Sequence, residues 1–451
     1  MRIFVYTVLI AIYILSRFFH APVISYSTGA VALVALAISA VYARGLYLIS
    51  GAIFLLIGFV LFIQSKQPWH TFILHFEQVL GLLSLFFVLP FMNSIIRVGR
   101  YDKHLSLLLQ DQAADLNHLY RRSSGVCHIL GLFLNIATAP LLIKSLNVIL
   151  HDLPKKVLTK FYSQNLLRAY ALCLTWSPME VMVSSTIDIT KVQYFIIFPI
   201  LLSMAIIMLG FDWLMSSYKY KGIQIAFHTP HFFNKKKGYK KAFELIGMLL
   251  LFIFMVSTVQ HFLQKGFLFS VVLLIIPFSA IWSLFIKKGK RYFTVAIQHW
   301  KERTRGLANY FFMFLGAGLF VEMLADSQLL SFLKPVFELG TEKTLILYST
   351  IGLYFFITSL IGFHPLVGFA LLSELLQPFL VDIPSIPLSI VLICSSLSTV
   401  MFSPFNISVS ILSDELSAQS YRIGSWNMIF ALGYIGFGIV VACFVEMFFM
   451  Y

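Results

Sequence analysis

The chain has 451 residues, of which 59% are hydrophobic and only 12% are charged, and its mean hydropathy is +0.88. A soluble domain carries about 25% charged residues, so this composition excludes a soluble protein and predicts a surface that faces lipid. The net charge of +14 lies in short loops between apolar segments, which is typical of the positive-inside rule and does not indicate a nucleic-acid partner.

Apolar segments long enough to cross a membrane recur along the whole chain. A helix needs about 20 apolar residues to cross a hydrocarbon core. We therefore predict an all-α polytopic membrane protein with eleven transmembrane helices, over residues 3–18, 22–43, 47–64, 72–97, 163–188, 192–216, 243–262, 266–286, 306–324, 386–412 and 424–448. Two more apolar segments, 126–150 and 345–379, have polar or proline-containing centres, and there we predict re-entrant hairpins.

Lysine and arginine predict the orientation. Loops 217–242 and 287–305 are rich in both residues and should be cytoplasmic, whereas the opposite loops carry only scattered charges. The eleven-span arrangement then places the N-terminus inside and Tyr451 outside the cytoplasmic membrane. Segment 101–122 is amphipathic, and we expect it to lie along the inner membrane surface.

Three ordered features recur at nearly the same offset and indicate a duplicated architecture. The two Ser-Pro prolines, Pro178 and Pro404, are 226 residues apart, and the hairpin prolines, Pro140 and Pro365, are 225 apart. Similar segments before the hairpins also begin 225 residues apart. The sequence predicts a peripheral helix (1–20), a first repeat (21–216) with broken helix 163–188, a basic cytoplasmic linker (217–242) and a second repeat (243–451) with broken helix 386–412.

Each predicted half crosses the membrane an odd number of times, so the second half should have inverted topology. Inverted repeats with broken helices at the midplane are typical of secondary transporters. This order of spans, hairpins and broken helices, together with "FFMFLGAGLFVEMLADSQLLSFL" from Phe311, resembles the ion transporter superfamily, especially the divalent anion:sodium symporters. The superfamily also includes arsenite and sodium/proton permeases. The resemblance implies elevator-type movement and a homodimer.

The predicted hairpin tips depart from the dicarboxylate carriers, which have Ser-Asn-Thr at both tips. The first tip contains Asn135 and Thr138, and the second runs from Ser359 to His364. The resemblance therefore does not imply a dicarboxylate substrate. Asn135, Thr138, Ser359 and His364 are candidate substrate ligands, with structural hydrogen bonding as the alternative for each.

The two Ser-Pro breaks predict the chemistry of the site. A proline inside a span removes a backbone hydrogen bond and frees carbonyls of the preceding turn. The half-helix after it points N–H groups and partial positive charge at the midplane, which suits an anion, while freed carbonyls suit Na⁺. Ser177 and Ser403 precede the prolines and are candidate substrate ligands.

Glu180 is an acid placed beside a predicted break, and Asn406 is its repeat partner and a further candidate substrate ligand. An intramembrane carboxylate is a functional candidate by default. Glu180 therefore either couples transport to an ion or merely caps its half-helix. Two other acids, Asp212 and Glu322, lie near predicted span ends and are expected at the membrane interface.

Motifs of metalloproteases, hydrolases and nucleotide-binding enzymes are missing, so we predict no enzyme, no metal site and no cofactor beyond Na⁺ as a coupling ion. The leading hypothesis is Na⁺- or H⁺-coupled transport of a small, anionic solute across the cytoplasmic membrane. A sodium/proton antiporter or an oxyanion exporter is the alternative within transport, and a non-transporting membrane scaffold is the alternative outside it. The expected partners are the lipid bilayer, the solute and a second copy of the chain.

Overall fold

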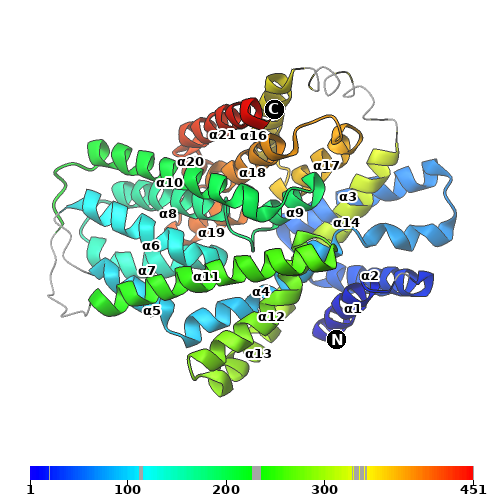
Figure 1. The fold of residues 1–451 in the computed structure, drawn as a ribbon, viewed down its shortest axis with the longest axis horizontal. Helices are drawn as coiled ribbons and strands as arrows, with labels where there is room; N and C mark the ends of the chain where they lie inside the picture. The colour runs from blue at the N-terminus through cyan, green and yellow to red at the C-terminus, as the bar shows by residue number, and fades with distance from the viewer. Residues whose placement is uncertain are drawn as a thin grey trace. The chain divides into compact units, whose positions relative to one another are not determined.

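The computed structural model describes residues 1–19, 21–110, 115–225, 235–327, 329, 335, 340 and 343–449. Throughout these residues the secondary structure is helical, without a β-strand (Figure 1). Eleven helical segments of the described chain are long and apolar enough to cross a membrane. This confirms the predicted all-α polytopic membrane protein.

The chain divides into two units, and each takes segments from both halves of the sequence. Unit 1 comprises Met1–Ile95, Phe262–Leu339 and Phe369–Phe379. Its helices are α1 (Arg2–Ser16), α2 (Pro22–Tyr42), α3 (Gly45–Ser65), η1 (Trp69–Phe76), most of α4 (Leu80–Val98), α12 (Phe267–Phe285), α13 (Gly289–Gly306), α14 (Ala308–Asp326), the C-terminal part of α17 (Pro365–Leu376) and η5 (Gln377–Phe379).

Unit 2 comprises Ile96–His261, Gly340–Gly368 and Leu380–Tyr451. Its remaining helices are α5 (Tyr101–Leu107), η2 (Leu108–Gln110), α6 (Leu116–Leu134), η3 (Asn135–Ala137), α7 (Thr138–Leu150), α8 (Lys155–Leu174), α9 (Val181–Thr190), α10 (Tyr194–Lys219), α11 (Lys235–Leu263), α16 (Thr344–Ile361), α18 (Ser385–Phe402), α19 (Ile407–Leu416), α20 (Ser420–Ser425) and α21 (Met428–Phe449).

Glycines bring α3 and α14 together in unit 1. A Cβ atom added to Gly316 would lie 2.8 Å from the Gly51 carbonyl oxygen, and one added to Gly58 would lie 2.9 Å from the Phe320 nitrogen. Small residues are the usual way to bring membrane helices into close backbone contact, because no hydrophobic force pulls apolar helices together in lipid. Any larger side chain at these glycines would push the two helices apart.

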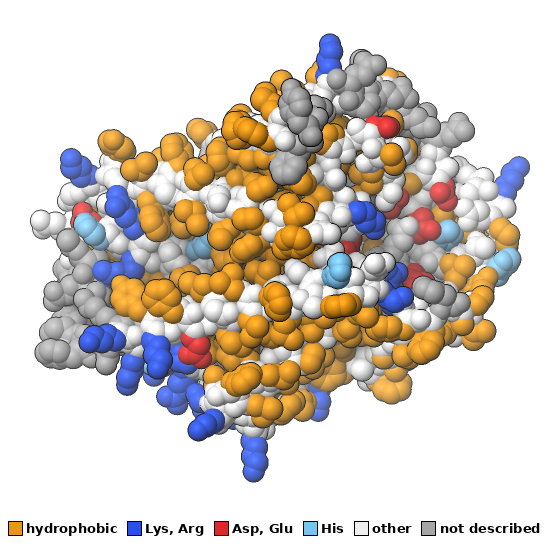
Figure 2. All heavy atoms as spheres, in the orientation of Figure 1, with side chains coloured by type: hydrophobic (Ala, Val, Ile, Leu, Met, Phe, Trp, Pro, Cys, Tyr) orange, Lys and Arg blue, Asp and Glu red, His pale blue; other side chains and the backbone are white. Residues whose placement is uncertain are grey.

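In unit 2, α18 is the central helix. Its residues from Pro387 to Phe402 are all buried, and it packs against α8, α9, α16 and α21. Elsewhere the helices of unit 2 face outward with apolar side chains. Figure 2 shows such side chains along α11, where Phe243 and Phe254 are largely exposed, with Lys and Arg side chains near its N-terminal end. This distribution is that of a span with a charged end at the membrane surface.

The helix bounds follow the offset that the prolines predict. The half-helices α9 and α19 both have 10 residues and begin 226 residues apart, at Val181 and Ile407. The helix pairs that contain the predicted hairpins, α6–α7 and α16–α17, begin at Leu116 and Thr344, which are 228 apart. The bounds thus have nearly the same offset as the prolines, and the duplication, the inverted topology and the re-entrant path of the two pairs stay predictions.

The eleven span-length segments are not the eleven that the sequence predicts. The predicted spans 3–18 and 163–188 are missing from them, because α1 has only 15 residues, α9 has only 10, and α8, although 20 residues long, carries four Lys and Arg residues. Leu116–Leu150 and Thr344–Ile361, both within or overlapping the predicted hairpins, take their places.

Two segments predicted to be non-spanning also differ. Segment 101–122 is not one surface helix: α5 ends at Leu107, α6 begins at Leu116, and Leu105 and Leu109 are fully buried. Loop 287–305 is almost entirely the helix α13.

The predicted orientation can be tested at Lys237, which is exposed on α11. Three of the four native cysteines are buried and Cys443 is partly exposed, so a Cys443→Ser variant has no exposed native cysteine that the reagent could label. In that background, Lys237→Cys should react with a membrane-impermeant maleimide only after the cells are opened. Labelling in intact cells would place loop 217–242 outside and overturn the orientation.

Candidate functional site

All eight predicted site residues lie in unit 2.

The two Ser-Pro sequences form the same turn. The Glu180 N–H donates to the Ser177 carbonyl at 3.2 Å, and the Asn406 N–H donates to the Ser403 carbonyl at 3.0 Å. Serine at the first position and proline at the second position are the residues that such a four-residue turn favours. Each proline therefore ends one helix and sets the turn from which the next begins.

Glu180 and Asn406 both occupy the N-cap of the half-helix that follows. Their backbones are extended, with φ and ψ of −88° and 128° for Glu180 and −79° and 140° for Asn406. Both carbonyls accept the first intrahelical hydrogen bond, from Ser184 at 2.9 Å and from Ser410 at 3.1 Å. The N–H groups and partial positive charge of α9 and α19 thus begin at equivalent points of the two halves.

The two caps differ in their side chains. The Asn406 Oδ1 accepts from the Ser408 N–H at 3.0 Å and from the Ser408 hydroxyl at 2.8 Å. The Glu180 carboxylate faces the N–H groups of Val181 and Met182 at the start of α9, but no side-chain capping hydrogen bond of normal geometry forms. Asn406 therefore makes a well-formed capping hydrogen bond, whereas Glu180 only faces the N-terminus of its half-helix.

This difference predicts unequal costs of truncation. Asn406→Ala should lower the free energy of unfolding by about 0.5–2 kcal/mol, the usual cost of losing an N-cap. Glu180→Ala should cost less, because it removes no capping hydrogen bond. Thermal melting of the two purified variants measures both, and a larger loss for Glu180→Ala would mean that the carboxylate caps α9.

Several carbonyls at the breaks already have protein partners. The Trp176 carbonyl accepts from the Tyr194 hydroxyl at 2.5 Å, and the Pro178 carbonyl accepts from the Ser184 hydroxyl at 3.0 Å. At the second break, the Val400 carbonyl accepts from the Ser408 hydroxyl at 2.6 Å and the Met401 carbonyl from the Asn427 amide at 3.2 Å. The carbonyls predicted to be free for Na⁺ are therefore largely occupied, which keeps the broken backbone stable inside the unit.

The second hairpin tip is bonded directly to the second break. The Ser403 hydroxyl donates to the Ser359 carbonyl at 2.8 Å, and both residues are buried. His364 stands immediately before α17, where its Nδ1 accepts from the Leu366 N–H at 3.3 Å. This bond gives His364 the role of a helix cap, which was the structural alternative for it.

The first hairpin tip is bonded to α8, just before the first break. Asn135 has a positive φ of 53°, and its Oδ1 accepts from the Ile136 N–H at 2.7 Å and from the Tyr170 hydroxyl. The Thr138 side chain is 1% exposed, and its hydroxyl has no hydrogen-bond partner among the described residues. Thr138 thus has a buried hydroxyl that could be offered to a ligand.

A buried ion pair that the sequence analysis missed lies beside these elements. Arg168 donates to Asp212 at 2.7 Å, and the two side chains are 6% and 1% exposed. Arg168 also donates to the Asn427 Oδ1 at 2.9 Å, and the Tyr120 hydroxyl donates to Asp212 at 2.8 Å. Asp212, which was expected at the membrane interface, is therefore buried within unit 2 and paired with an arginine of α8. The available signal was an arginine inside an apolar segment.

The ion pair lines a cavity of about 260 Å³ between α6, α8 and the C-terminal end of α10. Asn427 links the ion pair to the second break, since the Asn427 amide also donates to the Met401 carbonyl at 3.2 Å.

Glu322, the other acid expected at the interface, belongs to unit 1, where it is paired with His75 at 2.6 Å.

Neither a protein-family model nor a curated protein matches this sequence. Among solved structures, the fold is similar to that of the Alcanivorax borkumensis YdaH transporter, with a TM-score of 0.53 over 84% of this chain and 88% of the other. The chain has the fold of a membrane transporter. At 12% identity the likeness concerns the fold alone. The resemblance to divalent anion:sodium symporters stays a prediction.

Proposed function

We propose that this protein is a secondary transporter that moves a small, anionic solute across the cytoplasmic membrane, coupled to Na⁺ or H⁺. The observation that carries the proposal is the pair of matching turns at Ser177–Glu180 and Ser403–Asn406, each of which starts a half-helix inside a transporter fold. A single break is a common packing kink, whereas two breaks with the same turn and the same N-cap position form a symmetric pair.

The half-helices favour an anion for an electrostatic reason. Each N-terminus carries the equivalent of roughly half a positive charge, and Asn406 already caps the Ser408 N–H at the start of α19. In a site shielded from water such an N-terminus binds an anion more strongly than it would in an exposed position. Thr138 adds an unpartnered hydroxyl at the first tip.

The division into two units fits a moving site. All candidate site residues belong to unit 2, and hydrogen bonds tie both tips to the helices beside their breaks. A unit that carries a complete site can move as one body, which is the movement that the resemblance to the ion transporter superfamily implies. The homodimer belongs to the same proposal.

Glu180 supports the alternative within transport. A carboxylate without a capping bond at the N-cap of α9 is suited to take up a proton or Na⁺, as in a sodium/proton antiporter or an oxyanion exporter. The alternative from another class is a non-transporting scaffold. A scaffold does not require such a carboxylate or two matched half-helices.

Thermal melting of the purified protein against a panel of anions tests these functions. A ligand that binds only the folded state stabilises it by RT ln(1 + [L]/Kd), about 2.7 kcal/mol at 100 Kd. We expect one class of anion to stabilise the protein, and to do so more strongly with Na⁺ or at lower pH. Stabilisation by Na⁺ or protons alone would favour the antiporter, and no response to any ion would favour the scaffold.

A further inference from the structure

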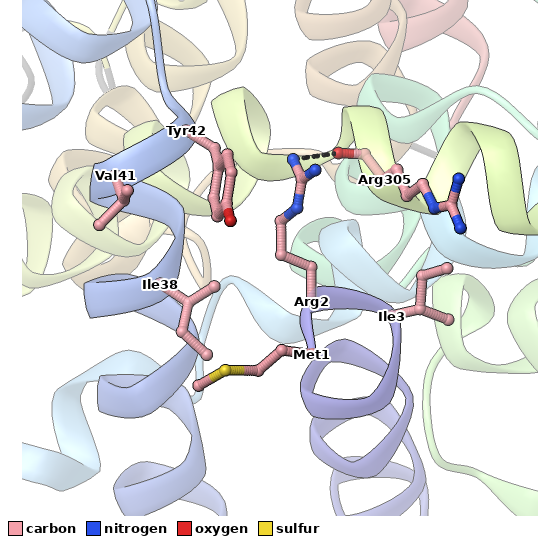
Figure 3. Close-up of a pocket in the computed structure, with 7 residues that line it drawn as sticks. All are labelled: Met1, Arg2, Ile3, Ile38, Val41, Tyr42 and Arg305. Atoms are coloured by element: carbon pink, nitrogen blue, oxygen red, sulfur yellow. Dashed lines mark hydrogen bonds between the residues drawn. The ribbon is translucent and has the colours of Figure 1, made fainter.

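A groove in unit 1 has a cationic rim and apolar walls. It lies between the start of α1, the end of α2 and the end of α13, and its volume is about 410 Å³ (Figure 3). Arg2 contributes a guanidinium, Arg305 contributes its carbonyl with its guanidinium directed away from Arg2 (Figure 3), and Ile3, Ile38 and Val41 contribute apolar surface. None of the residues that line the groove is acidic.

The Arg2 side chain is held in place by two contacts. Its guanidinium carbon lies 3.7 Å from the centre of the Tyr42 ring, and its Nη1 donates to the Arg305 carbonyl at 3.0 Å. Figure 3 shows the guanidinium between the Tyr42 ring and this carbonyl. A guanidinium has five N–H donors, so this arrangement orients Arg2 while most of its donors stay available.

The position of the groove along α2 places it at the membrane surface. Tyr42 is the last residue of an apolar span of 21 residues, and a tyrosine at a span end commonly lies at the level of the lipid headgroups. Apolar side chains are exposed here, since Val41, which lines the groove, is 78% exposed and Phe4, in the first turn of α1, is 73% exposed. A free anion in water gains nothing from these surfaces, whereas a lipid chain does.

We propose that this groove binds an anionic phospholipid. The phosphate pairs with the guanidinium of Arg2, the flexible Arg305 side chain turns toward the same phosphate, and an acyl chain lies on the apolar surface formed by α1 and α2. Arginine suits this contact because its fork of donors matches phosphate oxygens. A zwitterionic lipid is disfavoured, because its ammonium group meets a rim that contains two arginines and no acid.

Native mass spectrometry of delipidated protein mixed with phosphatidylglycerol or phosphatidylcholine tests the site. The variants are Arg2→Gln/Arg305→Gln and the single Arg305→Gln, whose side chain makes no hydrogen bond within the described chain. Lys290→Gln, exposed elsewhere on α13, is the control for a lost charge. Melting curves show whether each variant is folded.

We expect phosphatidylglycerol to stay bound to the wild type and to Lys290→Gln, with at least tenfold weaker binding to the double variant and intermediate binding to Arg305→Gln. Equal binding of phosphatidylglycerol by all four proteins would overturn the proposal, as would equal binding of the two lipids by the wild type. Inorganic phosphate that competes with phosphatidylglycerol at millimolar concentration would instead identify a site for a free anion and would also overturn it.

Discussion

Replacing Arg168 with methionine should lower the free energy of unfolding by about 3–5 kcal/mol, because it leaves the Asp212 carboxylate buried without its countercharge. Asp212 is 1% exposed, so bulk solvent does little to stabilise its lone carboxylate. The change also removes hydrogen bonds to Asn427 and to the Trp426 carbonyl. We expect this loss of stability to exceed that of Asn406→Ala, because an isolated buried charge costs more than a lost helix cap.

Thermal or denaturant unfolding in detergent measures this effect, with Lys221→Met at an exposed position as the control. The double variant Arg168→Met/Asp212→Asn should be more stable than Arg168→Met alone, because it removes the isolated charge. If the double variant is no more stable than the single one, the cost comes from lost packing and not from the unpaired carboxylate.

The second large effect concerns Glu180→Gln, which should leave the protein folded and abolish the ion dependence of transport. Glutamine keeps the size of the side chain and loses the charge, and no capping hydrogen bond is lost with it. Coupling between two ligands is typically worth 1–3 kcal/mol, or about 5- to 150-fold in affinity. An imposed Na⁺ or H⁺ gradient should therefore stimulate uptake by the wild type and leave uptake by the variant unchanged.

Proteoliposomes with imposed gradients measure this coupling. Glu415→Gln is the matched control, because Glu415 is an exposed acid on the other half-helix, α19. Ion-dependent uptake that persists in Glu180→Gln would end the coupling role of Glu180 while leaving transport itself in place.

The positions of the two breaks could be predicted because their cause is local. A proline removes a donor from its own helix, so Pro178 and Pro404 indicate the breaks without knowledge of any other element. The equal offset of the two halves, and the isolation of Glu180 as a carboxylate beside a break, are likewise properties of the printed sequence.

The Arg168 network could not be recognised in the same way. Asp212 lies 44 residues after Arg168, and Asn427 lies 259 residues after it. No periodicity connects positions so far apart, and only the packing of α8 against α10 and the start of α21 makes them partners. The same limit applies to Asn406, because a capping residue and a substrate ligand look identical in sequence.

The span assignments failed where hydropathy competes with helix geometry. Residues 163–188 fall on two helices: α8 has 20 residues but carries Lys155, Lys156, Lys160 and Arg168, and α9 has only 10 residues. In contrast, Thr344–Ile361 is one uninterrupted helix of 18 residues, so it has the length of a span although it forms the first arm of a predicted hairpin.

The order of partners along the chain has a consequence for biosynthesis. Ribosomes add about 5–20 residues per second, so Asp212 emerges only a few seconds after Arg168. Trp426 and Asn427 follow 258 and 259 residues after Arg168, on the order of tens of seconds later. The ion pair can thus neutralise the charge of a nascent α8 in the bilayer long before the C-terminal part of unit 2 exists. A chain that lacks Asp212 would expose an unpaired arginine throughout that interval, to the quality-control proteases of the membrane.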